Sequence, residues 1–296
     1  MLSKILFSTL RVSTPLILAG MAGLLSQQVN LLNIALEGFM LLGAFVAVVV
    51  GAQLNSVWLG LLAAIAFTVL LSGIFALFVI DLRAHLIVAG LAVNILVLGL
   101  TAFLLVILFG ARGSYSPEGL ISLPNIAIPL LDQVPFIGEV LSGHSALVYF
   151  SWTSIMVVYL LLYRTPLGAH IRAVGEHAEA AVTAGIPVKQ VRYIALLLGG
   201  ALCGMAGAQL SIGNLNLFTD NMTSGRGFIA LAAVFFGGAR PVLTALGCLL
   251  FGFFEAIQFR LQTKTGMPSQ LWQMLPYLIV IFVLALISLR KKRLHV

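Results

Sequence analysis

The stretch VWLGLLAAIAFTVLLSGIFALFVI, residues Val57–Ile80, decides the fold class of this chain. It contains no charged side chain. A helix of about 20 apolar residues crosses the roughly 30 Å hydrocarbon core of a bilayer. A strand of a membrane barrel would alternate apolar and polar residues, whereas this stretch is apolar throughout. It therefore predicts a membrane-spanning helix.

Similar apolar runs recur along the chain, which is 61% hydrophobic and only 8% charged. Soluble domains carry roughly 25% charged residues. Spans are expected at about residues 8–27, 31–50, 57–80, 86–110, 146–163, 191–212, 226–237, 241–262 and 270–289. The segment 226–237 is too short to cross alone and is expected to be a half-helix. We therefore expect an all-α polytopic membrane protein with about 8–10 transmembrane helices, forming one domain over residues 1–296.

Basic residues cluster between the expected spans. They lie in the tail Arg290–Arg293, in the polar loop 164–192 and at Arg240. Basic residues at helix ends mark the cytoplasmic side of a membrane, so the net charge of +7 indicates topology and not nucleic-acid binding. We expect the loop 164–192 and the C-terminus in the cytoplasm of a bacterial cell. The net acidic loop 111–145 is then extracytoplasmic.

Two groups of residues oppose this orientation. Lys4 and Arg11 at the start, and Arg260 and Lys264 near the end, would fall on the outer side. Either one segment is re-entrant or one span is miscounted.

No metal site and no cofactor are expected. Cys203 and Cys248 both fall in expected spans, and the five histidines form no HxxxH or HxxE pair. Such spacing is what a His/Cys metal site requires.

The string GMAG occurs twice, at Gly20–Gly23 and Gly204–Gly207. Each copy is followed by a stretch rich in Asn and Gln, and then by a charged residue, Gly and Phe: Glu37-Gly38-Phe39 and Arg226-Gly227-Phe228. The expected spans place the copies in opposite directions. The pattern predicts an inverted internal repeat with discontinuous helices, a common transporter plan. A chance match in a chain with 29 glycines is the alternative.

Polar interruptions at corresponding positions point to a transport path, because backbone inside hydrocarbon must be hydrogen-bonded or line a cavity. Amides would bind a small neutral solute, and phenyl rings would offer flat faces. Helix–helix contacts for the amides, and packing or lipid contact for the rings, are the alternatives. The candidate path residues are Asn30, Asn33, Glu37, Phe39, Asn214, Asn216, Arg226, Phe228 and Glu255.

Glu37 and Glu255 are the acids deepest in apolar sequence. A carboxylate there costs a few kcal/mol and needs a partner or a proton. Arg226 is a candidate partner. Structural pairing, substrate contact and ion coupling are the three roles that remain open.

The loop RTPLGAHIRAVGEHAEAAVTAGIPVKQVR, Arg164–Arg192, interrupts the apolar pattern most strongly. Its Ala and Glu content predicts a helix of about three turns over residues 172–185, which Gly185 and Pro187 end. Glu176, His177, Glu179 and Ala180 would face water or a soluble partner.

At this point the chain resembles the permease family of ABC importers that includes the branched-chain amino acid, ribose and nucleoside permeases. The similarity covers nearly the whole chain and looks closest to the nucleoside or simple-sugar branch. It rests on RTPLGAHIRAVGEHAEAAVTAGI (Arg164–Ile186), VNLLNIALEGFMLLGAF (Val29–Phe45), TSGRGFIALAAVFFGGARP (Thr223–Pro241) and MPSQLWQMLPY (Met267–Tyr277).

The resemblance implies a non-catalytic subunit that imports nucleosides by alternating access. Two permeases would form the path, either two copies of this chain or, as the nucleoside branch favours, two different chains. Two cytoplasmic ATPases would dock on the coupling loop, and a solute-binding protein would deliver substrate outside. The sequence has no Gly-Lys dipeptide, so a Walker A loop is absent. The residues expected to couple to the ATPase are Arg172, Gly175, Glu176, His177, Glu179, Ala180 and Gly185.

Three other functions stay open. A simple-sugar or branched-chain amino acid permease would share the fold. A secondary transporter driven by protons or sodium would use Glu37 or Glu255 as its essential acid. A membrane scaffold would transport nothing and would tolerate substitution of Asn33 or Arg226.

Overall fold

The computed structural model describes residues 2–117, 122–128, 137–264 and 274. Within these ranges, seven helices are long and apolar enough to cross a membrane. They contain α1 (Leu2–Gln27), α2 (Leu36–Gln53), α3 (Val57–Ala76), α4 (Leu86–Phe109), α7 (Ala146–Arg164), α10 (Val188–Ala208) and α12 (Pro241–Lys264). The all-α polytopic fold is confirmed. The last expected span and the basic tail lie outside the described residues.

Shorter elements connect these helices. π-Helical turns η1 (Leu77–Asp81) and η2 (Gln209–Gly213) extend α3 and α10. The two-residue strands are β1 (Ser114–Tyr115), β2 (Asn125–Ile126), β3 (His144–Ser145) and β4 (Phe218–Thr219), with β1 paired to β4 and β2 to β3. The remaining helices are α6 (Ile137–Leu141), α8 (Pro166–Glu176), α9 (Ala178–Thr183) and α11 (Arg226–Phe236).

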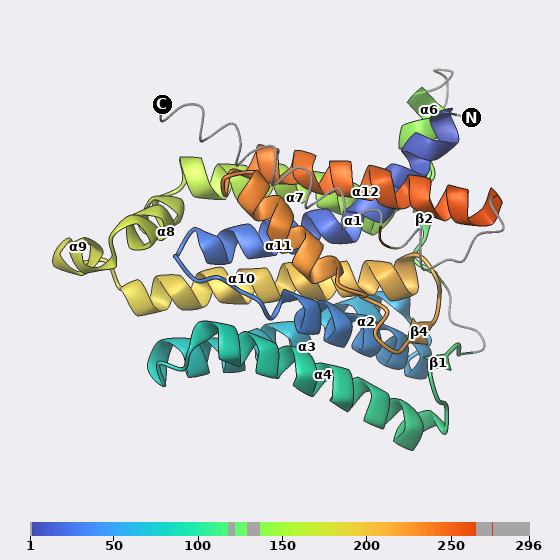
Figure 1. Ribbon diagram of the computed structural model, residues 1–296, viewed down its shortest axis with the longest axis horizontal. Coiled ribbons are helices and arrows are strands. Elements are labelled where there is room, and N and C mark those ends of the chain that lie inside the picture. Colours follow the sequence, from blue (N-terminus) through green and yellow to red (C-terminus); the bar gives the residue numbers. More distant parts are fainter. Residues whose placement is uncertain (1, 118–121, 129–136, 265–273, 275–296) are drawn as a thin grey trace.

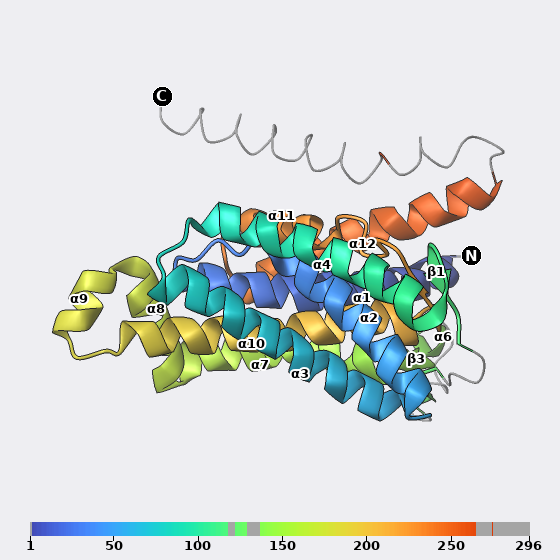
Figure 2. The same ribbon diagram turned by 90° about the horizontal axis from the view of Figure 1, so that it is seen from below.

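Helices α1, α2 and α10 form the centre of the bundle, and α3 and α4 lie at its edge (Figures 1 and 2). Of the 18 most apolar consecutive residues, 78% are buried in α2 and 17% in α4. The exposed residues of α4 are large and apolar, including Ile95 and Phe103. Helix α4 therefore presents a face that suits lipid, whereas α2 contacts protein nearly all round.

The two helices that carry GMAG run antiparallel. Figure 1 shows α1 running toward the end of the molecule where α8 and α9 lie, while α10 starts at that end and runs away from it. Each is followed by an irregular break, residues 28–35 and 214–225, and each break leads into a new helix, α2 or α11. This is the arrangement that an inverted repeat with discontinuous helices predicts. The 226–237 half-helix is confirmed as α11, Arg226–Phe236.

The two ends of the bundle differ. We call the end with α8 and α9 the coupling end, and the end with β1, β2 and α6 the outer-loop end (Figure 1). The first turn of α1 and the last turn of α12 both lie at the outer-loop end. Lys4 and Arg260 therefore share that end with the 111–145 loop, as the sequence count implied. Helix α11 is the segment that does not cross.

The helix expected over residues 172–185 is wrong in its bounds. The structure has two helices, α8 and α9, separated at His177, whose backbone is extended (φ −153°, ψ 92°). Helix α8 starts earlier because Thr165 caps it, accepting a hydrogen bond from the Gly168 N–H at 3.1 Å, and Pro166 takes the first helical position. Thr-Pro is a strong start signal. Gly185, at φ +79°, does follow the last turn as expected.

Candidate functional site

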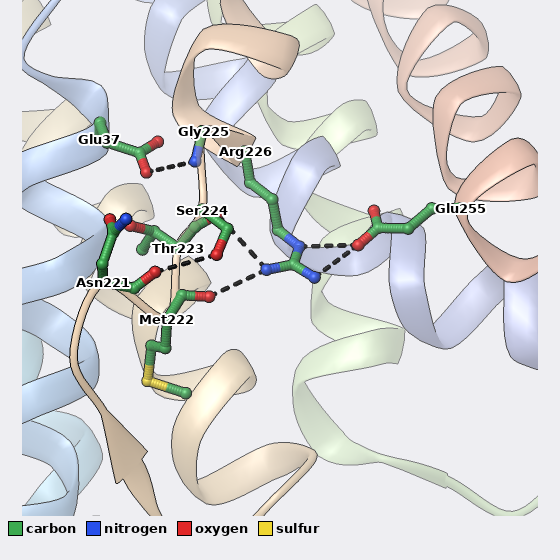
Figure 3. Close-up of polar contacts among 8 residues, drawn as sticks. All are labelled: Glu37, Asn221, Met222, Thr223, Ser224, Gly225, Arg226 and Glu255. Atoms are coloured by element: carbon green, nitrogen blue, oxygen red, sulfur yellow. Dashed lines mark hydrogen bonds and ion pairs between the residues drawn. The ribbon is translucent and has the colours of Figure 1, made fainter. Parts of the chain in front are cut away.

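Two helix N-termini, those of α2 and α11, meet inside the bundle. The Glu37 carboxylate, in the first turn of α2, reaches the start of α11 (Figure 3). Its Oε1 accepts a hydrogen bond from Gly225 N and its Oε2 one from Gly227 N, both at 2.7 Å. The first N–H groups of a helix lack partners within the helix and carry partial positive charge. An ionised carboxylate therefore satisfies both donors, and we call this contact the polar junction.

Glycine is required on the α11 side of the polar junction. Gly225 has φ +82°, a conformation that favours glycine. A Cβ on Gly227 would lie 2.6 Å from Glu37 N and 2.8 Å from Glu37 Oε2. The sequence Gly-Arg-Gly thus lets the helix start approach a carboxylate directly. Glu37 itself is only 8% exposed.

Arg226 turns away from Glu37 toward α12. Its Nε donates to Glu255 Oε1 at 2.9 Å, and its Nη1 donates to the Met222 carbonyl oxygen at 2.9 Å (Figure 3). The Arg226 and Glu255 side chains are 17% and 10% exposed. Arg226 therefore pairs with Glu255, one of the two acids that the sequence analysis considered as its partner. The other acid, Glu37, binds backbone N–H groups instead.

The start of α2 is held by a residue that the sequence analysis missed. Gly38 N donates to Asn94 Oδ1 of α4 at 2.8 Å, and Asn94 Nδ2 donates to the Ile34 carbonyl oxygen at 3.0 Å. Asn94 is the one amide in the otherwise apolar stretch of α4. An Asn inside such a stretch is a detectable signal, because a polar group there needs a partner.

The other candidate amides do not form one cluster. Asn33 is fully buried, and its Oδ1 accepts from Ala35 N at 3.0 Å within the first break. Asn214 Oδ1 accepts from Gln209 Nε2 at 3.1 Å. Asn30 and Asn216 adopt positive φ, at +57° and +54°, as turn residues do. These contacts are local and shape the two breaks.

The two candidate phenylalanines lie in different surroundings. Phe39 is fully buried and meets Phe75 edge to face, with ring centroids 5.9 Å apart. Phe228, at the equivalent position of α11, is 44% exposed. Asn221 and Ser224, in the second break just before α11, are exposed as well. The second half thus exposes polar side chains and a phenyl ring between residues 221 and 228.

The coupling residues lie on α8 and α9, which project from one end of the bundle (Figure 1). Glu176, His177, Glu179, Ala180 and Gly185 are exposed, as expected. The Arg172 guanidinium lies over the Tyr163 ring, 5.2 Å from its centroid. Gly175 packs against the end of α1, where a Cβ would lie 2.0 Å from the Gln28 carbonyl oxygen. The coupling segment is therefore a rigid projection in direct backbone contact with the bundle.

No group of His, Cys, Asp and Glu side chains in the described part of the chain has the arrangement of a metal site. Cys203 and Cys248 are both buried as free thiols.

Several known proteins are similar in sequence to this chain over nearly its whole length. The family model for the branched-chain amino acid transport system / permease component matches residues 5–284. The guanosine ABC transporter permease protein NupQ of Bacillus subtilis is 36% identical, covering 96% of this chain and 91% of NupQ. The nucleoside ABC transporter permease protein NupC of Lactococcus lactis is 34% identical, covering 93% and 89%.

A third relative is named for a different solute. A Haloferax volcanii protein provisionally named glucose ABC transporter permease protein TsgC13 is 34% identical, covering 97% of this chain and 92% of its own. No solved structure matches the chain.

Proposed function

The chain belongs to the family of permease components of branched-chain amino acid transport systems, and on that premise we propose that it is a membrane subunit of an ATP-driven importer of nucleosides. The relatives NupQ and NupC are named as guanosine and nucleoside ABC permeases. The chain is a multi-pass membrane protein whose path for substrate opens and closes by alternating access. Residues 1–296 form one transmembrane domain.

The observation that carries this proposal is the coupling segment. Helices α8 and α9 are short and project from one end of the bundle, and α8 packs on the bundle through the backbone of Gly175 and the buried Ile171 and Val174. A flexible linker would absorb a displacement, whereas a short helix in backbone contact passes it on. We infer that an ATPase subunit docks here, on the residues from Arg172 to Gly185. ATP hydrolysis then takes place in that separate subunit, since the chain has no Walker A loop.

The substrate path, in this proposal, runs along the accessible region of the second break. Phe228 offers a face on which a nucleobase stacks, and the exposed side chain of Asn221 offers hydrogen-bonding groups to a sugar. Arg226 and Glu255 lie behind this region and neutralise each other. A neutral solute fits such a surface better than a charged one. The buried first-half residues Asn33 and Phe39 do not contact substrate in this proposal but support the path from within the bundle.

The other partners follow from the same proposal. A second permease, a related chain and not a second copy, completes the path opposite the second break. A solute-binding protein delivers substrate at the outer-loop end. The coupling end faces the cytoplasm of a bacterial cell, and the C-terminus, outside the described residues, lies on the cytoplasmic side as its basic tail indicates.

The docking proposal is tested by bulky substitutions on α9. Glu179→Trp and Ala180→Trp should each insert normally in the membrane yet retain little ATPase on affinity purification of the complex. Gln53→Trp, an exposed position at the other end of the bundle, is the matched control. Wild-type guanosine uptake by both α9 variants would refute the assignment.

The substrate proposal is tested by uptake into proteoliposomes that contain the complete transporter and its binding protein. Guanosine uptake should be driven by ATP and should be blocked by excess uridine but not by leucine. A sugar permease is the second candidate, because TsgC13 is named for glucose. Uptake of glucose, with none of guanosine, would favour that candidate. Uptake driven by a proton gradient without ATP would favour a secondary transporter.

A further inference from the structure

Gln28 lies where three elements of the coupling end converge. Its backbone contacts α8, because a Cβ on Gly175 would lie 2.0 Å from the Gln28 carbonyl oxygen. There is no room between the two backbones for a side chain. A displacement of α8 toward the bundle therefore moves the turn at Gln28 directly.

The side chain of Gln28 continues this connection to the far half of the molecule. Its Nε2 donates a hydrogen bond of 2.7 Å to the carbonyl oxygen of Ala239, 211 positions later in the sequence. Ala239 belongs to the turn that ends α11, and its N–H donates to the Val234 carbonyl oxygen at 3.0 Å. Ala239 has φ +53°, so this turn is a defined C-terminal cap and not a loose end.

The surrounding structure is open. A cleft of about 330 Å³ separates α8 from the turn after α11, and its lining includes Gln27, Gln28, Arg172, Gly175, Ala239 and Arg240. Gln28 and Ala239 both line this cleft, and the hydrogen bond between them joins the turn after α1 to the turn after α11. Gln28 therefore contacts α8 through its backbone and the turn after α11 through its side chain.

Helix α11 is attached at both ends. Its 11 residues span about 16 Å. The Gln28 bond holds the turn at its C-terminal end, and the Glu37 carboxylate holds Gly225 and Gly227 at its N-terminal end. A short helix is stiff along its axis, so a push or pull at Ala239 reaches the polar junction with little loss.

We propose that Gln28 is a positioning residue that transmits the movement of the coupling segment to α11, and through α11 to the polar junction. The inference rests on the proposed function in one respect, namely that an ATPase supplies the movement. It adds the route within this chain and the residue on which that route depends. Gln28 itself contacts neither substrate nor ATPase in this proposal.

The first test compares Gln28→Leu with Gln27→Leu in proteoliposomes that contain the complete importer. Both residues line the same cleft, but the buried Gln27 Oε1 has no hydrogen-bond partner in the described part of the chain. Leucine keeps the volume and removes the donor. We expect guanosine uptake per ATP hydrolysed to fall about tenfold in Gln28→Leu, within the range typical of coupling between sites. Gln27→Leu should retain the wild-type ratio.

A rescue variant separates transmission from simple packing. Gln28→Lys keeps an N–H donor long enough to reach the Ala239 carbonyl oxygen, so it should restore most of the uptake per ATP. If only side-chain volume mattered, Gln28→Leu would perform as well as Gln28→Lys. Equal ratios in Gln28→Leu, Gln27→Leu and the wild type would overturn the proposal.

The second test does not depend on the identity of the substrate. Spin labels at Phe235→Cys on α11 and Leu62→Cys on α3, both exposed positions outside the proposed substrate path, report the distance between these helices; the native Cys203 and Cys248 are buried. ATP with vanadate should change this distance in the Gln27→Leu background and not in the Gln28→Leu background. The same change in both, or none in the wild type, would overturn the route through Gln28. Failure of the ATPase to bind the wild-type chain would instead refute the proposed function.

Discussion

The two halves of this protein begin alike and end differently. In each half a GMAG helix, α1 or α10, leads through an irregular break into a new helix that starts inside the bundle. The start of α2 is held by a neutral amide, Asn94, whereas the start of α11 is held by a carboxylate, Glu37. The first break is short and leads to the buried Phe39, while the second exposes Asn221 and Phe228.

The two halves are therefore held together by different kinds of interaction. Neutral hydrogen bonds and close packing hold the first half in place, and we call it the frame. Charged groups hold the second half: Glu37 binds the start of α11, and Glu255 binds Arg226. Charge-assisted hydrogen bonds are stronger than neutral ones but concentrate the stability in few groups. In the route that we propose, the second half is the part whose position a displacement at the coupling end changes.

The largest expected effect concerns the ion pair that exists only in the second half. Arg226→Met leaves the nearly buried carboxylate of Glu255 without its partner, and should lower the free energy of unfolding by about 4 kcal/mol. The double variant Arg226→Met/Glu255→Gln removes both charges and should be more stable than the single variant. Equilibrium unfolding in SDS and mixed micelles measures both. A double variant no more stable than Arg226→Met would contradict the pairing.

The next effect compares the two helix starts directly. Glu37→Ala removes two charge-assisted bonds and leaves the buried Gly227 N–H and the partly buried Gly225 N–H unpaired, and should destabilise by about 3 kcal/mol. Asn94→Ala removes a neutral cap and should cost about 1 kcal/mol. The same SDS titration ranks the two variants. If Asn94→Ala proved the more damaging change, the assignment of frame and moving part would have to be reversed.

The smallest effect compares matched glycines in the two GMAG strings. A Cβ on Gly207 would lie 2.0 Å from the Met40 carbonyl oxygen, so Gly207→Ala should destabilise by about 2 kcal/mol through overpacking. A Cβ on Gly23 would meet the Leu36 side chain at 3.0 Å. That methyl group can rotate away, so Gly23→Ala should stay within about 0.5 kcal/mol of the wild type. Thermal unfolding in detergent would detect the difference, and similar melting temperatures would contradict it.

Much of the fold was predictable because the relevant signals are local. Apolar runs predicted the seven described spans, although α1 begins at Leu2 and not at residue 8 and α2 begins at Leu36 and not at residue 31. The shortness of one run predicted the half-helix α11. The early start of α8 was missed because the Ala-rich composition outweighed the Thr-Pro start signal at Thr165.

The site was less predictable. Both acids were picked out by their depth in apolar sequence, yet the Glu37 partners are backbone N–H groups of Gly225 and Gly227. Every residue except proline has a backbone N–H group, so no side-chain pattern in the sequence predicts which of them Glu37 binds. The Gln28 contact with Ala239 likewise joins residues far apart in the chain.

The sequence by itself determined that the chain is helical, crosses a membrane repeatedly and has a polar segment between two of its spans, because hydrophobicity and charge act residue by residue. Only the tertiary structure decided which acid pairs with Arg226, which carboxylate holds α11, and which glutamine connects the coupling end to that helix. These choices depend on the positions of atoms that lie close in space and far apart in sequence.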